Sequence, residues 1–304
     1  MEPGHSDVLV FLDDLQAAEH AGAAALERWI VVCADPLLRG GLRVLRARDE
    51  AHAALALERL RELGGHPRQG VSSGLDALCS ALGSDAVSDR AKLGMLLARF
   101  PRKASDPFAT VVRPDEGDDE TRALLEAVSR EDRVSVEWLR TVEDAPPVVP
   151  RERIGADERA AVVAFLGALC AATDGAAEVA ETWTAACRSD GLRGGLRALA
   201  ARTAAHAAVL RERLRELGGA PGRVTLSPSL LAAARARYGS TEIGDHEKLA
   251  SMLHPADHDA TPARVIETFA ASLAEDVETR EILRLVAAGD KTTIVWLTAY
   301  RATA

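Results

Sequence analysis

Two stretches of this chain have closely similar sequences. Residues 26–67 read LERWIVVCADPLLRGGLRVLRARDEAHAALALERLRELGGHP, and residues 180–221 read AETWTAACRSDGLRGGLRALAARTAAHAAVLRERLRELGGAP. Aligned without a gap at an offset of 154 residues, the two are identical at 25 of 42 positions. Such self-similarity indicates that one module has been duplicated within the chain.

Weaker matches extend this repeat toward the end of each copy. At offsets of 156 and 158 residues, Lys92 pairs with Lys248 and Trp138 pairs with Trp296. The proline-rich stretch DAPPVVP at 144–150 is a natural seam between the copies. We therefore predict two domains, 1–146 and 147–304.

The composition favours helices over strands. Of 304 residues, 47% are hydrophobic but only 4% are aromatic, and strands favour aromatic and β-branched side chains. The net charge of −9 disfavours nucleic acid as a partner, because phosphate recognition uses a surplus of lysine and arginine. The longest uninterrupted apolar run, 160–172, has 13 residues, fewer than the ~20 that cross a bilayer, so we predict no membrane span.

The N-terminus and the cysteines indicate a cytoplasmic location. Glu2 stands where a secretory signal would carry a basic residue. The four cysteines have no CxxC spacing and lie in apolar helical patterns, so we expect reduced core residues. They are Cys33, Cys79, Cys170 and Cys187.

Apolar residues recur every three or four positions throughout each copy, which predicts an all-α protein. Asp35 followed by Pro36 is a helix start, and Gly64 followed by Gly65 is a helix stop. The Gly40-Gly41 pair and its repeat at 194–195 lie inside helices, which indicates close packing against the backbone or a bend. In copy one, the predicted helices are 7–34, 36–63, 73–82, one that begins near 88 and is threatened by Pro101, Pro107 and Pro114, and 118–143.

The second long helix carries an acid and a histidine three residues apart, Asp49 and His52. This pattern resembles the ferritin-like superfamily, which includes bacterioferritins and rubrerythrins. The resemblance implies two tandem four-helix bundles. In that superfamily, glutamates on two helices and Glu-x-x-His motifs on the other two hold two iron or manganese ions.

Copy one matches the ligand pattern in part. Glu19 and Asp49 are equidistant from the predicted turn near residue 34, so in an antiparallel hairpin they lie at the same depth. Asp132 matches the acid of the last helix. The candidate metal ligands are therefore Glu19, Asp49, His52 and Asp132, whereas Glu50 is expected to face solvent.

Other positions depart from the superfamily pattern. Ser135 replaces the histidine of the last helix, and depth matching places Arg99 where an acid is required. We hypothesise that Arg99 pairs with the interior carboxylates in place of metal. In copy two, Thr173, Thr203 and Thr293 stand at ligand positions, and His206 and Asp290 remain.

Two histidine-containing features have simpler interpretations. His52 and His206 are flanked by alanines, so each is also compatible with a hydrogen-bonded histidine packed between helices. The hexapeptide HPADHD at 254–259 suits either a solvated loop or a zinc or nickel site.

The packing residues persist between the copies while the ligand positions change, which favours a non-catalytic scaffold with a degenerate site. This scaffold would contain no cofactor and would bind a protein partner or a second copy of itself through helical faces. The alternative is an iron or manganese oxidoreductase with one site in copy one and dioxygen or peroxide as co-substrate, as the resemblance implies. A storage cage fits poorly, because a fused tandem would have to build an unusual shell.

Overall fold

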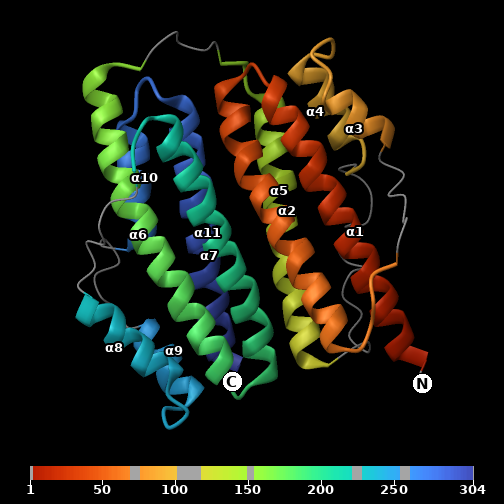
Figure 1. Cartoon of the computed structure of the whole chain (residues 1–304), viewed down its shortest axis with the longest axis vertical. Helices are drawn as coiled ribbons and strands as arrows, with labels where there is room; N and C mark the ends of the chain where they lie inside the picture. The colour runs from red at the N-terminus through yellow and green to blue at the C-terminus, as the bar shows by residue number, and fades with distance from the viewer. Residues whose placement is uncertain are drawn as a thin grey trace. The chain divides into compact units, whose positions relative to one another are not determined.

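The computed structural model describes residues 3–68, 76–100, 118–148, 154–220, 228–253 and 261–303 (Figure 1). Eleven helices and no strand lie in these ranges, so the all-α prediction is confirmed. The chain divides into two compact units, unit 1 at Met1–Pro150 and unit 2 at Arg151–Ala304. The division falls at the end of the proline-rich stretch, four residues beyond the predicted boundary at 146.

Unit 1 has three long helices and two short ones. Its elements are α1 (Pro3–Val32), α2 (Pro36–Glu62), α3 (Asp76–Leu82), α4 (Asp89–Leu97) and α5 (Asp119–Asp144). The predicted ends of these helices are within four residues of those observed. α4 ends ahead of Pro101, whose ring disfavours helical conformation in the residue before it.

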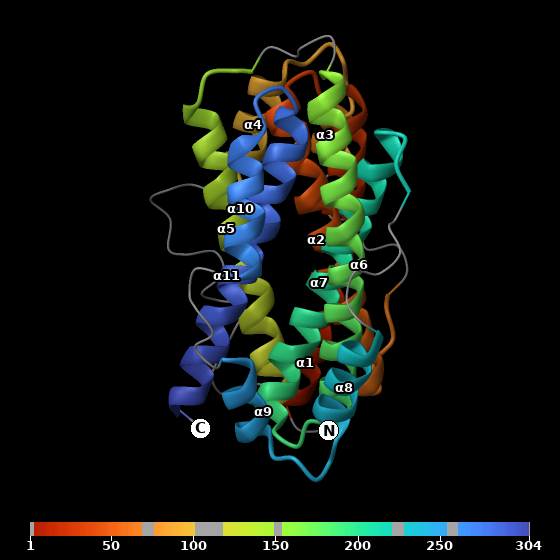
Figure 2. The ribbon, with the colours of Figure 1, turned by 90° about the vertical axis from the view of Figure 1, so that its left-hand side faces the viewer.

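Unit 2 has a related order of elements. Its helices are α6 (Ala156–Ala186), α7 (Asp190–Glu216), α8 (Pro228–Gly239), α9 (Asp245–Met252), α10 (Pro262–Ser272) and α11 (Val277–Thr303). α6 and α7 run side by side (Figure 2). Among the described residues, each unit thus has three long helices, and a fourth long helix is not observed.

The helix ends follow the capping residues read from the sequence. Asp35 accepts hydrogen bonds from the backbone nitrogens of Leu37 and Leu38 at 2.8 and 3.2 Å, which fixes the start of α2. Gly64 and Gly218 end α2 and α7 with φ angles of 80° and 74°, which side-chain-bearing residues rarely adopt.

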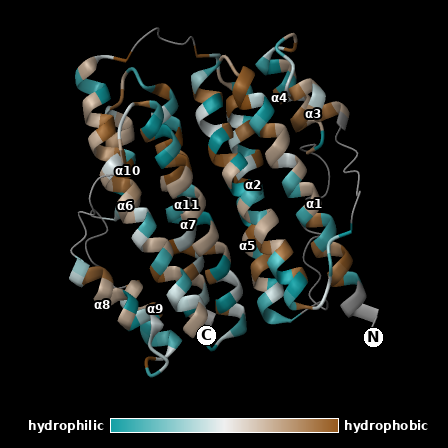
Figure 3. Cartoon of the chain, in the orientation of Figure 1, coloured by the Kyte–Doolittle hydropathy of each residue, from teal (hydrophilic) through white to brown (hydrophobic). Residues whose placement is uncertain are grey.

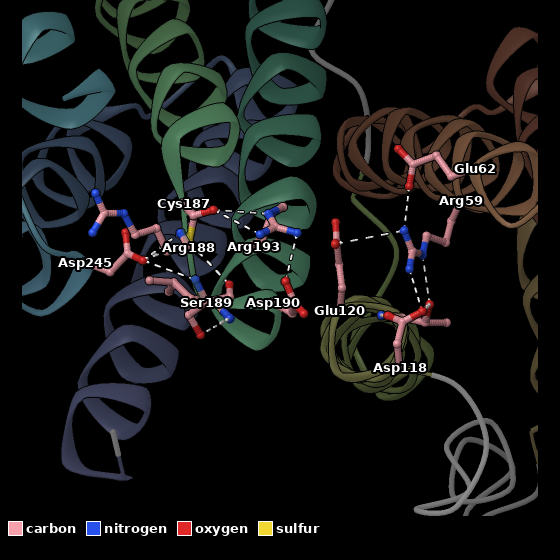
Figure 4. A network of polar contacts seen from close by, with 12 residues as sticks. Arg59, Glu62, Asp118, Glu120, Cys187, Arg188, Ser189, Asp190, Arg193 and Asp245 are labelled. Atoms are coloured by element: carbon pink, nitrogen blue, oxygen red, sulfur yellow. Dashed lines mark hydrogen bonds and ion pairs between the residues drawn. The ribbon is translucent and has the colours of Figure 1, made fainter. Parts of the chain in front are cut away.

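The repeated tryptophans make the same contacts in both units. Trp29 donates through Nε1 to Asp89 Oδ1 at 2.8 Å, and Trp183 donates to Asp245 Oδ1 at 3.2 Å. The other oxygen of Asp245 accepts hydrogen bonds from the backbone between α6 and α7 (Figure 4). These contacts tie each short fourth helix to a long hairpin.

The second tryptophan of each unit explains the glycine pairs. A Cβ atom on Gly41 would lie 1.9 Å from Trp138 Cζ2, and one on Gly195 would lie 1.9 Å from Trp296 Cζ2. The prediction of close packing at these glycines is therefore confirmed.

A buried arginine joins the end of α2 to the start of α5. Arg59 donates to Asp118 at 2.6 Å, to Glu62 at 2.6 Å and to the hydroxyl of Thr121 at 2.8 Å (Figure 4). In unit 2, Arg213 makes the corresponding contacts with Asp276, Glu216 and Thr279.

One described helix, α6, is long and apolar enough to cross a membrane by length and composition. Its 18-residue window has a mean hydropathy of 1.7, and 33% of that window is buried within the protein. In the long helices, apolar and polar residues are interspersed (Figure 3). A protein with several membrane spans is not indicated by the described helices.

Candidate metal centre

Three of the four predicted ligands converge inside unit 1. Glu19 from α1, His52 from α2 and Asp132 from α5 each offer one ligand atom, and these atoms all lie within 4.8 Å of one another. Glu19 and His52 meet because α1 and α2 form a hairpin joined by residues 33–35. Asp132 reaches the cluster from the middle of α5.

The two ring nitrogens of His52 have different surroundings. Nε2 lies 3.1 Å from Oε2 of Glu131 in a hydrogen bond. Nδ1 lies 3.1 Å from Oδ1 of Asp132 and 3.7 Å from Oε2 of Glu19, yet it is buried and forms no hydrogen bond. A metal-binding histidine typically holds its other ring nitrogen on a carboxylate, and Glu131 holds Nε2 of His52 in this way.

Charge raises the pKa of His52. Burial by itself would lower this pKa, because the side chain is 2% exposed. Asp132, Glu131 and Glu19 outweigh burial and raise the pKa well above its ordinary value. Without a metal ion, the ring is therefore held as an imidazolium.

Asp49, the fourth predicted ligand, lies beside this cluster with no partner of its own. Its side chain forms no hydrogen bond or ion pair with the described residues, and a Cβ on Gly22 would lie 2.9 Å from its Oδ2. Burial, followed by the charges of Glu19 and Asp132, raises its pKa well above the ordinary value. Burial also raises the pKa of Glu19, and Asp132 adds to that effect.

The cluster holds more carboxyl groups than cations. Arg48, at 3% exposure, and His52 are its cationic members, and its four carboxyl groups are Glu19, Asp49, Glu131 and Asp132. When all six are ionised, two negative charges remain unbalanced. An excess of negative charge in a largely buried cluster is relieved by protons or by a cation, so a divalent ion would balance this set.

A second ion would lack ligands, because Arg48 occupies the other side of the cluster. Its Nη1 donates to Oγ of Ser135 at 2.7 Å and to the carbonyl of Glu131 at 3.2 Å. Ser135 stands at the position where the superfamily pattern has its second histidine. The donor set therefore fits one ion and not two.

Arg99 does not form the predicted interior ion pairs. It is exposed and follows the end of α4 at Leu97, and it makes no ion pair with Glu19, Asp49 or Asp132. Depth matching assumed a continuous helix through residue 99, and that helix had already ended. The interior cation is Arg48, which sequence reasoning missed together with Glu131.

A pocket of about 410 Å³ opens beside the carboxylates. Glu19, Asp49 and Asp132 contribute to its lining, and most of the remaining lining residues are apolar. The pocket gives a small molecule access to the cluster.

Unit 2 lacks most of these groups. Thr173 and Thr203, which replace Glu19 and Asp49, donate to carbonyls of their own helices at 2.8 and 2.7 Å. Gly289 replaces Glu131, and a Cβ there would lie 2.7 Å from the ring of His206. Asp290 remains, and burial raises its pKa to about 6 although Arg202 opposes the shift.

The other candidate ligands contribute nothing to this centre. The hexapeptide at 254–259 lies outside the described residues. All four cysteines are free, and three of them are buried, at 33, 170 and 187. Burial raises the pKa of Cys170 to about 11 and that of Cys187 to about 12, so both remain thiols.

Comparisons with family models, with curated proteins and with solved structures gave no significant match.

Proposed function

We propose that unit 1 binds one divalent iron or manganese ion through Glu19, Asp49, His52 and Asp132. The observation that carries this proposal is the convergence of Glu19, His52 and Asp132, whose ligand atoms all lie within 4.8 Å of one another. Glu131 holds the opposite ring nitrogen of His52. A ring nitrogen with two carboxylates suits either metal.

The neighbouring residues prepare this site. Glu131 fixes the ring of His52, and Arg48 in turn lies with its Nε 3.8 Å from the Glu131 carboxylate. Asp49 contributes an unpaired carboxyl group at the pocket wall. When bound, iron or manganese would supply Lewis-acid and redox chemistry.

We further propose that the chain is a tandem duplication of a ferritin-like unit, acting as an oxidoreductase with dioxygen or peroxide as co-substrate. The pocket supports catalysis over a purely structural ion because it leads a small molecule to the carboxylates. Unit 2 would be the structural partner, since it keeps the tryptophan and arginine contacts but has threonines in place of Glu19 and Asp49 and a glycine in place of Glu131.

Metal content of the untagged full chain, purified without chelator, tests this function. We expect about one iron or manganese ion per chain, lost in His52→Ala and retained in the matched control His206→Ala. Equal loss in both variants, or full retention in His52→Ala, would remove the support for the site.

The second candidate function is the metal-free scaffold. The His52 side chain favours this alternative, because its imidazolium form makes ion pairs with Glu131 and Asp132 that need no metal. A chain that contains no metal after growth with added iron and manganese, and binds none afterwards, would reject the metal site and favour this alternative.

A further inference from the structure

The pocket of unit 1 has apolar walls and charged groups contributed by different elements. Its volume is about 410 Å³, within the range of sites for small organic ligands. The carboxylates come from α1, α2 and α5, whereas a cation, Arg99, follows α4. The apolar lining includes Leu26, Leu45, Leu78, Leu82, Phe100 and Leu139.

Small residues on α1 make room for the pocket. Ala18, Gly22 and Ala25 line it along one face of the helix. At an offset of 154 residues, Ala25 corresponds to Val179, which packs against the core of unit 2. The small side chain at this position is therefore present in unit 1, which has the carboxylate cluster, and is replaced by a larger one in unit 2.

Arg99 is positioned to bind an anion. Its guanidinium is exposed and forms no hydrogen bond or ion pair with the described residues. Once a divalent ion balances the carboxylates, Arg99 is the charged group of the described lining that remains unpaired. A guanidinium binds a carboxylate through two parallel hydrogen bonds.

We infer that this pocket binds an amphipathic monocarboxylate, with its aliphatic or aromatic body along the apolar walls and its carboxylate on Arg99. The far end of that body would then face Glu19, Asp49 and Asp132. The inference rests on the proposed function, because the divalent ion balances the three carboxylates that would otherwise repel an anion, whereas the contacts with the ligand come from the apolar walls and Arg99.

Calorimetry on the full chain with decanoate, decanol and decylamine tests the inference, in metal-free and manganese-treated protein. We expect decanoate to bind most tightly. Arg99→Gln should weaken decanoate about 10-fold or more and leave decanol unchanged. The matched control Arg90→Gln, on the exposed side of α4, should change neither. Ala25→Leu should weaken both ligands by filling the pocket.

Three results would overturn the inference. These are tighter binding of decylamine than of decanoate, an unchanged decanoate affinity in Arg99→Gln, and no binding of any probe. Metal binding is a separate readout. If the chain binds decanoate but takes up no manganese, the proposed function is rejected and the ligand class stands. If it takes up manganese but binds no decanoate, the ligand class is rejected and the proposed function stands.

Discussion

Replacing Asp49 by asparagine should stabilise the metal-free protein. The carboxylate of Asp49 has no hydrogen-bond or ion-pair partner among the described residues, and burial with the repulsion of Glu19 and Asp132 outweighs the attraction of His52 and Arg48. Asparagine keeps the shape and polarity of this side chain but cannot ionise, and each unit by which folding raises a pKa costs about 1.4 kcal/mol once the group is charged. We therefore expect Asp49→Asn to raise the free energy of unfolding at pH 8 by about 1–3 kcal/mol.

The pH dependence gives this prediction its sign. Because the folded-state pKa of Asp49 is raised, the folded protein holds a proton that the unfolded chain releases, so stability falls as pH rises toward the folded-state pKa. Near pH 4, the side chain is neutral in the folded protein and only about half ionised in the unfolded chain. The gain in Asp49→Asn should therefore be smaller at pH 4 than at pH 8.

Urea unfolding of the chelator-treated full chain, combined with hydrogen exchange of α2 peptides, measures the effect within unit 1. The matched control is Glu50→Gln on the same helix, because Glu50 is exposed and its pair with Arg46 is a surface pair worth less than about 0.5 kcal/mol. Destabilisation by Asp49→Asn at pH 8, or an equal effect at pH 4 and pH 8, would refute the reasoning.

Three further predictions concern packing, the repeated polar contacts and proton release. Gly41→Ala should lower the free energy of unfolding by about 1–3 kcal/mol, because the added Cβ would overlap Trp138. Gly94→Ala, whose Cβ would meet nothing within 4 Å, should raise it by up to about 1 kcal/mol, and urea unfolding distinguishes the two. Thr121→Val and its repeat Thr279→Val should each cost about 1–3 kcal/mol, since each leaves an arginine Nε without its acceptor, and unequal losses would contradict equivalent roles in the two units. Manganese affinity should rise with pH up to the raised pKa of His52, because Nδ1 must lose its proton to bind metal. Calorimetry in two buffers of different ionisation enthalpy should detect that proton, and a pH-independent affinity would contradict His52 ligation.

The sequence predicted the helices well because local chemistry sets their ends. Asp35 and Asp118 cap α2 and α5, and Gly64 closes α2 in a conformation that suits glycine. α1 and α2 are continuous helices joined by a short link, so counting residues from the turn placed Glu19 at the depth of Asp49, and His52, one turn beyond Asp49, lies beside Glu19.

Depth matching did not succeed where the chain leaves helical geometry. Arg99 follows the end of α4, so residue counting carries no information about its depth. Arg48 and Glu131 were missed for another reason. Each is adjacent to a predicted ligand, and only the rotation of α2 against α5 shows that both turn inward.

The stoichiometry of manganese bound to the full chain in equilibrium dialysis tests the central claim most directly. A single site in unit 1 predicts one ion per chain, reduced to none by His52→Ala and unchanged by His206→Ala. Two ions per chain, or no binding at any pH at which the chain is folded, would contradict the account.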